Sequence, residues 1–271
     1  MRAAAAVLLL LLPFTASGQH VTGAEHVRFF SRDESQLLGW WMPAARRGPA
    51  VIALHGCLGL YGRKGDLNER NRAMADLLRE RGFSVLFVDS FTPRGFRELC
   101  TVKLVERTLR AADRRSDVQG ALDWLGARPE VDAQRIVLLG WSNGGNAVLA
   151  SLDRGVKVRS AIAFYPACRN YVDRKAPYHP SAPLLILIGA LDDWTPAAWC
   201  MALKERTHKD LELRVLPDAY HDFDHPSAPL RVRKDVPGGI HPGHGVTVGT
   251  NLVARRDAYA AMFEFLEREL R

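Results

Sequence analysis

The sequence feature that most constrains the fold is the run RIVLLGWSNGGNAVLA at residues 135–150. Its first half is an unbroken apolar stretch, which is typical of a strand buried on both faces. Its second half has the apolar spacing of a helix, and the sequence Gly-Trp-Ser-Asn-Gly lies between the two. A serine on a sharp strand-to-helix turn exposes its hydroxyl, and flanking glycines let the two backbones approach each other. We therefore predict that Ser142 is a nucleophile.

The first 18 residues differ in character from the rest of the chain. Arg2 is followed by an apolar run at 3–12, and the residues at 16–18 are small. This pattern predicts a signal peptide, 1–18, that is cleaved before Gln19, and the apolar run is too short to span a bilayer. We expect residues 19–271 to form a single exported domain, a monomer without a membrane anchor, in the periplasm or outside the cell.

The formal net charge is +7, with 37 basic residues against 30 acidic ones. The basic side chains are scattered along the chain, which favours a solvated surface over nucleic-acid binding. No set of His, Asp and Glu residues has the spacing of metal ligands, so we expect neither a metal nor another cofactor. His241 and His244 lie in a Gly- and Pro-rich segment that is typical of a surface loop.

Apolar strands and amphipathic helices alternate along the chain. Two antiparallel strands are predicted at 26–30 and 37–42, followed by buried strands at 50–54, 83–88, 136–139, 158–165, 184–188 and 211–216. Helices are predicted at 67–81, 146–155, 197–207 and 251–270, and the segment 101–126 is predicted to be mostly helical, with Val105 in its buried stripe. This alternation indicates one doubly wound, mostly parallel α/β sheet with helices on both faces. Sites in such sheets form at the carboxyl ends of the strands.

Three loops that follow predicted strands carry residues suited to nucleophilic catalysis. They hold Ser142, the pair Asp192 and Asp193, and His221, in the chain order that α/β-hydrolases use. A serine hydroxyl needs an imidazole to accept its proton, and the imidazole needs a carboxylate to fix its tautomer and stabilise its charge. Either aspartate could supply the carboxylate. We choose His221 as the base because it lies directly beyond the last predicted strand, with His225 as its competitor.

Acyl transfer also requires N–H groups that stabilise an oxyanion. The N–H of Asn143, directly after the nucleophile, and the N–H of Cys57 in the loop at 55–59 are the candidate donors. Neither role uses a side chain, so we expect the sulfur of Cys57 to be structural. His55 precedes the serine in the chain, and we expect it to shape its loop.

Five segments together resemble the dienelactone hydrolase family of α/β-hydrolases. They are HGCLG at 55–59, DSFTPRG at 89–95, GWSNGG at 140–145, DDWTP at 192–196 and AYHDFD at 219–224. They occur in the order of the family and span nearly the whole mature chain. The resemblance implies that Asp192, four residues before Pro196, is the acid of the triad, with Asp193 as the fallback.

The chain departs from the namesake enzymes of this family in its nucleophile. The namesakes carry a cysteine and are cytoplasmic, whereas this chain has Ser142 and a predicted export signal. This favours a general esterase activity on a small ester or lactone over dienelactone itself. Arg94 lies near the position of a substrate-binding arginine in the namesakes, so it either binds an acidic substrate or stabilises the fold. Candidates to line an apolar pocket are Trp194, Trp199, Phe91, Phe96 and Tyr165.

The chain has four cysteines, and all of them lie in the predicted mature part. An even count in an exported chain favours disulfides, for which the residues alone allow three connectivities. The topology of the family implies the pairs Cys57–Cys100 and Cys168–Cys200.

Two other classes of function fit the same residues. A peptidase or a polymer-ester hydrolase would use the same triad, because specificity lies in the surrounding loops. A non-catalytic exported binding protein would keep the fold without using the triad.

Overall fold

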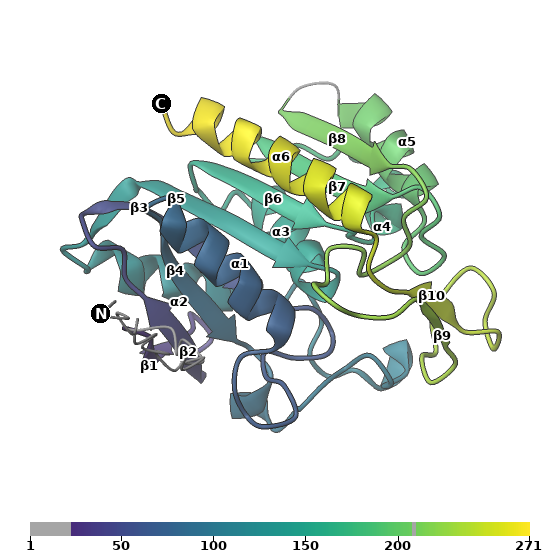
Figure 1. The fold of residues 1–271 in the computed structure, drawn as a ribbon, viewed down its shortest axis with the longest axis horizontal. Helices are drawn as coiled ribbons and strands as arrows, with labels where there is room; N and C mark the ends of the chain where they lie inside the picture. Colours follow the sequence, from purple (N-terminus) through teal and green to yellow (C-terminus); the bar gives the residue numbers. More distant parts are fainter. Residues whose placement is uncertain (1–22, 208–209) are drawn as a thin grey trace, which may run out of the picture.

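The computed structural model describes residues 23–207 and 210–271, so the predicted signal peptide lies outside the described residues. The main sheet consists of β1 (Glu25–Phe30), β2 (Gln36–Met42), β3 (Gly48–Leu54), β4 (Ser84–Asp89), β5 (Val131–Trp141), β6 (Ser160–Phe164), β7 (Leu184–Gly189) and β8 (Leu211–Leu216). The strand order is β1-β2-β4-β3-β5-β6-β7-β8 (Figure 1). The six strands from β4 to β8 in this order run parallel, while β1 and β2 pair antiparallel at one edge, as the sequence predicted.

Helices lie on both faces of this sheet. They are α1 (Glu69–Glu80), α2 (Arg115–Gly126), α3 (Asn143–Asp153), α4 (Arg169–Val172), α5 (Ala197–Thr207) and α6 (Leu252–Glu269). In Figure 1, α1 and α6 cross in front of the sheet, and α2 and α3 lie behind it. The predicted doubly wound α/β architecture is therefore confirmed.

The core lies between the sheet and these helices. Every residue of β4, β6 and β7 is buried, because each of these strands has neighbours on both sides and helices on both faces. The unbroken apolar runs of the sequence correspond to these central strands.

The predicted helical segment 101–126 is helical only in its second half. The chain between β4 and α2 contains only two single turns of 3-10 helix in the described structure, η1 (Thr92–Arg94) and η2 (Leu104–Glu106). Val105, predicted to be buried, is 93% exposed. Tertiary contacts fix this path, since Cys100 is bonded to Cys57 and Leu109 packs into a small apolar cluster with Phe91. The local spacing of apolar residues could not reveal those contacts.

A second, smaller sheet precedes the last helix. It consists of β9 (Arg231–Arg233) and β10 (Val246–Val248), which pair antiparallel beside the carboxyl ends of the main strands (Figure 1). Val248 also forms a bridge with His221, so this small sheet joins the loop after β8. In the part of the chain that the structure describes, none of the helices combines the length and apolarity needed to cross a membrane.

Candidate active site

Ser142 lies in a strained turn between β5 and α3. Its backbone has φ 51° and ψ −113°, a conformation that L-residues rarely adopt and that recurs at functional sites. The glycines on both sides make the turn possible. A Cβ on Gly140 would lie 2.3 Å from the carbonyl oxygen of Gly144, and a Cβ on Gly144 would lie 2.0 Å from that of Leu54.

The close approach at Gly144 gives a stability prediction. Gly144→Ala is expected to lower the free energy of unfolding by at least about 3 kcal/mol, because the added methyl group meets backbone that cannot move independently. Gly126→Ala is the matched control, since a Cβ at that site meets nothing within 4 Å. Urea denaturation of both variants measures the difference. Equal stability of the two variants would contradict the close approach of the backbone to Gly144.

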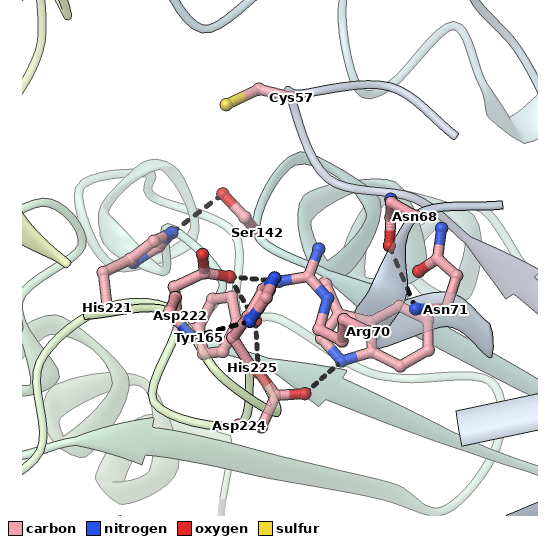
Figure 2. A network of polar contacts seen from close by, with 12 residues as sticks. Cys57, Asn68, Arg70, Asn71, Ser142, Tyr165, His221, Asp222, Asp224 and His225 are labelled. Atoms are coloured by element: carbon pink, nitrogen blue, oxygen red, sulfur yellow. Dashed lines mark hydrogen bonds and ion pairs between the residues drawn. The ribbon is translucent and has the colours of Figure 1, made fainter. Parts of the chain in front are cut away.

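The side chains of Ser142, His221 and Asp192 form a continuous hydrogen-bonded chain. Ser142 Oγ lies 3.0 Å from His221 Nε2, and His221 Nδ1 lies 2.7 Å from Asp192 Oδ2. Figure 2 shows the serine hydroxyl directed at the imidazole. The three residues come from the loops after β5, β8 and β7, all at the carboxyl edge of the sheet. This is the geometry in which an imidazole can remove the proton of a serine.

The two neighbouring aspartates have different partners. Asp192 is buried, and its Oδ1 accepts hydrogen bonds from the N–H groups of Trp194 (2.9 Å) and Thr195 (2.7 Å). Asp193 instead accepts from the N–H and the hydroxyl of Thr247, both at 2.8 Å. Asp192 is thus the carboxylate that contacts the imidazole of His221, and Asp193 binds Thr247 in strand β10.

His225, the competing candidate for the base, forms hydrogen bonds within its own loop. His225 Nδ1 accepts hydrogen bonds from the N–H groups of Ser227 (3.2 Å) and Ala228 (3.0 Å), which closes a turn of its own loop. His55 is fully buried, with Nδ1 at 2.8 Å from the carbonyl oxygen of Gly56. Burial, together with the positive charge of Arg114, holds the pKa of His55 well below its usual value. A neutral, buried imidazole at this place fits the predicted role of shaping the loop.

The two candidate oxyanion donors lie beside Ser142. Asn143 is the first residue of α3, where N–H groups have no partner within the helix, and Cys57 lies in a turn closed by Gly59 N–H to Gly56 O at 3.1 Å. A buried arginine supports both segments. Arg114 Nη1 donates to the carbonyl oxygen of His55 (2.9 Å) and to Asn143 Oδ1 (2.8 Å).

A second buried arginine holds the loop that carries the histidine. Arg70 Nη1 donates to Tyr165 Oη at 2.8 Å and forms an ion pair with Asp222, the residue after His221 (Figure 2). Burial alone would raise the pKa of Asp222, but facing Arg70 it is lowered. Asp224 accepts from Tyr165 Oη at 2.6 Å, and burial raises its pKa. The loop is therefore fixed on both sides of the imidazole.

Sequence reasoning missed Arg70 and Arg114, although the sequence contains a signal for both. Each arginine has apolar residues at helical spacing after it. Met74 and Leu78 follow Arg70, and Val118, Ala121 and Leu125 follow Arg114. All of these side chains are buried. An arginine on the apolar face of a helix must find partners in the interior, because a buried charge without them is very costly. Burial lowers the pKa of Arg114 to about 10.

Arg94 is not in the site, which corrects its prediction as a substrate-binding residue. Its guanidinium binds Asp117 through two hydrogen bonds, at 2.7 and 3.0 Å, and also Asp33 at 3.0 Å. It lines neither of the two pockets at Ser142. The fold-stabilising alternative for Arg94 is the one that the structure supports.

Two pockets meet at Ser142. Both are lined by Ser142, Trp194 and the sulfur-bearing pair Cys57 and Cys100. The first also has Gly56, Leu58, Arg70, His221, Asp222, Arg231, Arg233 and Val248 in its wall. The second has Leu104, Arg107, Asn143, Asn146, Ala167, Thr195 and the segment 237–239. Of the five aromatic residues proposed to line a pocket, Trp194 does so here, with its ring centroid 4.8 Å from that of His221.

The other proposed aromatic residues line neither of these two pockets, although Phe96 lines a separate pocket. Phe91 is buried with Leu99 and Leu109, and Phe96 packs against the same cluster. Tyr165 is fully buried, with its ring centroid 4.4 Å from that of His221. Trp199 packs against the main core.

The two predicted disulfides are present. The Cα atoms of Cys57 and Cys100 are 4.9 Å apart, and those of Cys168 and Cys200 are 5.0 Å apart. Among the described residues, no group of three or more His, Cys, Asp or Glu side chains could hold a metal ion.

A sheet of this order with a serine elbow, a histidine and an aspartate at its carboxyl edge defines the α/β-hydrolase class. The chain belongs to the dienelactone hydrolase family, whose model matches residues 40–270. It is 27% identical to the uncharacterized protein YfhR of Escherichia coli K12, over 73% of each chain.

Two further comparisons extend this relationship. A protein of a Bradyrhizobium species, described as "probable 2-oxo-3-(5-oxofuran-2-ylidene)propanoate lactonase", is 27% identical over 65% of this chain and 74% of its own. The structure of the dienelactone hydrolase-like promiscuous phosphotriesterase P91, from metagenomic libraries, superposes with a TM-score of 0.64. That match has 19% identity and covers 92% of this chain and 100% of the other.

Proposed function

We propose that this protein is a serine hydrolase that cleaves a small carboxylic ester or lactone through an acyl-enzyme. The observation that carries the proposal is the hydrogen-bonded chain from Ser142 Oγ through His221 to Asp192, which opens into two pockets. The family and the lactonase of the Bradyrhizobium species support carboxylic ester chemistry.

In the proposed mechanism, His221 accepts the proton of Ser142 Oγ while that oxygen attacks the ester carbonyl. Asp192 keeps the imidazole in the required tautomer and stabilises its positive charge. The N–H groups of Cys57 and Asn143 stabilise the oxyanion that forms. His221 then donates its proton to the departing alkoxide. A water molecule, deprotonated by the same imidazole, then attacks the acyl carbon, and the imidazolium returns that proton to Ser142 Oγ as the acid leaves.

The two pockets suggest how an ester is oriented. The oxygen of the leaving group must come within reach of His221 Nε2, so the alcohol part belongs in the pocket that His221 lines. The acyl part then extends into the second pocket, beside Asn143 and Ala167. In the first pocket, Arg70 is paired with Asp222 and Arg233 with Asp235, while Arg231 is exposed and forms no ion pair with the described residues. A net positive charge thus borders the alcohol side.

Arg231 is therefore expected to favour esters with an anionic leaving group. The test measures kcat/KM for para-acetoxybenzoate and for its neutral analogue para-acetoxybenzamide. Each value is divided by the rate constant for hydrolysis of the same ester by hydroxide, which corrects for intrinsic reactivity. The quantity compared is the ratio of the corrected value for the benzoate to that for the benzamide. The wild-type ratio should fall by about threefold to tenfold in Arg231→Gln, the range of a partly screened single charge. Arg256→Gln, which removes an exposed charge on α6, should leave the ratio unchanged. An unchanged ratio in Arg231→Gln would refute this orientation.

A panel of chromogenic esters of increasing acyl length, together with a small lactone, tests the proposed function itself. We expect turnover of short acyl esters and labelling of Ser142 by an organophosphonate that reacts with activated serines. No turnover of any ester and no labelled serine would favour a binding protein of this fold. Turnover of peptide or polymer esters alone would favour the second class of hydrolase.

We also propose that the protein is exported, with residues 1–18 as the signal peptide and 19–271 as the mature domain. The two disulfides support an extracellular or periplasmic location, because such bonds persist in oxidising compartments. Sequencing the N-terminus of the protein recovered from such a compartment should identify Gln19 as the first residue. Recovery of reduced, uncleaved protein in the cytoplasm would contradict the proposal.

A further inference from the structure

The Cys57–Cys100 disulfide is attached to a residue of the proposed catalytic machinery. The N–H of Cys57 is one of the two oxyanion donors of the proposed function, on which this inference rests, and the side chain of the same residue is bonded to Cys100. Figure 2 shows Cys57 above the hydroxyl of Ser142. The bond therefore restrains the backbone that carries the donor.

The loop at 56–59 and the segment at 97–100 are held together by the disulfide, by a hydrogen bond and by a close approach of their backbones. Leu99 N–H donates to the carbonyl oxygen of Cys57 at 2.7 Å. Gly59 has φ +85°, and a Cβ there would lie 2.4 Å from the carbonyl oxygen of Arg97. No regular strand or long helix holds the segment 97–100, since the described chain between β4 and α2 forms only single 3-10 turns. The covalent bond is thus the strongest restraint on this contact.

The same disulfide is the centre of an apolar cluster that is separate from the main core. Cys57 and Cys100 pack with Val236, Val246 and Val248, and Trp194 packs against this cluster. These residues come from parts of the chain that are far apart in the sequence. Both sulfur-bearing residues also line both pockets at Ser142. The bond is therefore a wall of the pockets as well as a restraint on the donor.

The second disulfide provides a natural comparison. Cys168 and Cys200 belong to the main core, join the short helix α4 to α5, and line neither pocket at Ser142. The two bonds close loops of similar length, with sequence separations of 43 and 32 residues. Loop closure should therefore restrict the unfolded chain to a similar extent in both cases.

We propose that the Cys57–Cys100 disulfide is a positioning element of the active site, which places the Cys57 N–H and the pocket wall for transition-state stabilisation. Cys168–Cys200, in contrast, stabilises the fold alone. The positioning role predicts a loss in kcat, because an oxyanion donor acts on the transition state more than on the bound ester.

Paired variants separate the two roles. Cys57→Ala/Cys100→Ala should lower kcat for a short aryl ester by about 10- to 100-fold, less than the 10²- to 10³-fold loss on removing a donor outright, with KM changed by less than about threefold. Cys168→Ala/Cys200→Ala should keep kcat within about twofold. Both double variants should lower Tm. A second variant, Cys57→Ala/Cys100→Val, controls for poor folding of Cys57→Ala/Cys100→Ala, because its valine refills the apolar cluster. It should show the same loss in kcat.

A trifluoromethyl ketone provides the readout that a structural role would not affect. Its adduct with Ser142 carries an oxyanion, so its affinity should fall in Cys57→Ala/Cys100→Ala by the same factor as kcat/KM. Equal kcat in the two double variants, or a loss of kcat without a loss of ketone affinity, would overturn the inference. Wild-type hydrolysis that persists in Ser142→Ala would instead refute the proposed function, so the two failures are distinguishable.

Discussion

Ser142→Ala is expected to lower kcat for ester hydrolysis by about 10⁴-fold or more, because the variant has no hydroxyl to form the acyl-enzyme. The methyl group that remains fits the space of the native side chain, so Tm should change by only a few degrees. Initial rates with a short aryl ester, and thermal unfolding of the same samples, measure both quantities. The organophosphonate adduct should also disappear.

Ser227→Ala is a suitable control for this experiment. Ser227 is a serine of the loop after His221, and its hydroxyl donates to Glu69 at 2.7 Å on the exposed surface. The rate of ester hydrolysis by Ser227→Ala should stay within about twofold of the wild-type rate, as expected for a surface substitution. Hydrolysis by Ser142→Ala at the wild-type rate would mean that another residue is the nucleophile.

Asp192→Asn should lower kcat for ester hydrolysis by about 10⁴-fold, nearly as much as Ser142→Ala. An amide in place of the carboxylate cannot stabilise the imidazolium, and it donates a hydrogen bond where His221 Nδ1 requires an acceptor at 2.7 Å. The effect should appear in kcat more than in KM, because the positive charge on the imidazole develops in the transition state.

The neighbouring residue provides the matched control for this substitution. Asp193→Asn makes the same chemical change one position along the chain, but its carboxylate binds Thr247 and not His221. We expect a loss in kcat of less than about tenfold and a lower Tm, since the contact with β10 weakens. If Asp193→Asn reduced kcat as much as Asp192→Asn, the assignment of the acid would be wrong.

The parts of the site that could be predicted from the sequence depend on residues close together in the chain. The serine elbow is one of these, because the glycines two positions away on either side allow the strand and helix backbones to approach closely. The buried strands are another, since their apolar runs have only one stable environment. The resemblance to the family added the pairing of the four cysteines, which the structure confirms.

Other features depended on contacts between distant parts of the chain. Asp192 and Asp193 have the same chemistry and differ by one position, and only the packing of β10 against their loop separates their partners. The sequence leaves two roles open for Arg94, and its ion pairs with Asp117 and Asp33 favour stabilisation of the fold. No local pattern contains such information, because a side chain's partner is fixed by where the sheet brings remote segments together.

The sequence by itself determined the type of fold, the strained turn that holds the proposed nucleophile, and the order of the loops that carry the candidate triad, because periodic burial and backbone strain are local properties. Only the tertiary structure decided which acid faces the imidazole, which arginines are buried as supports, and where the segment 101–114 runs. These outcomes result from desolvation and pairing between remote groups, and they exist only once the chain has folded.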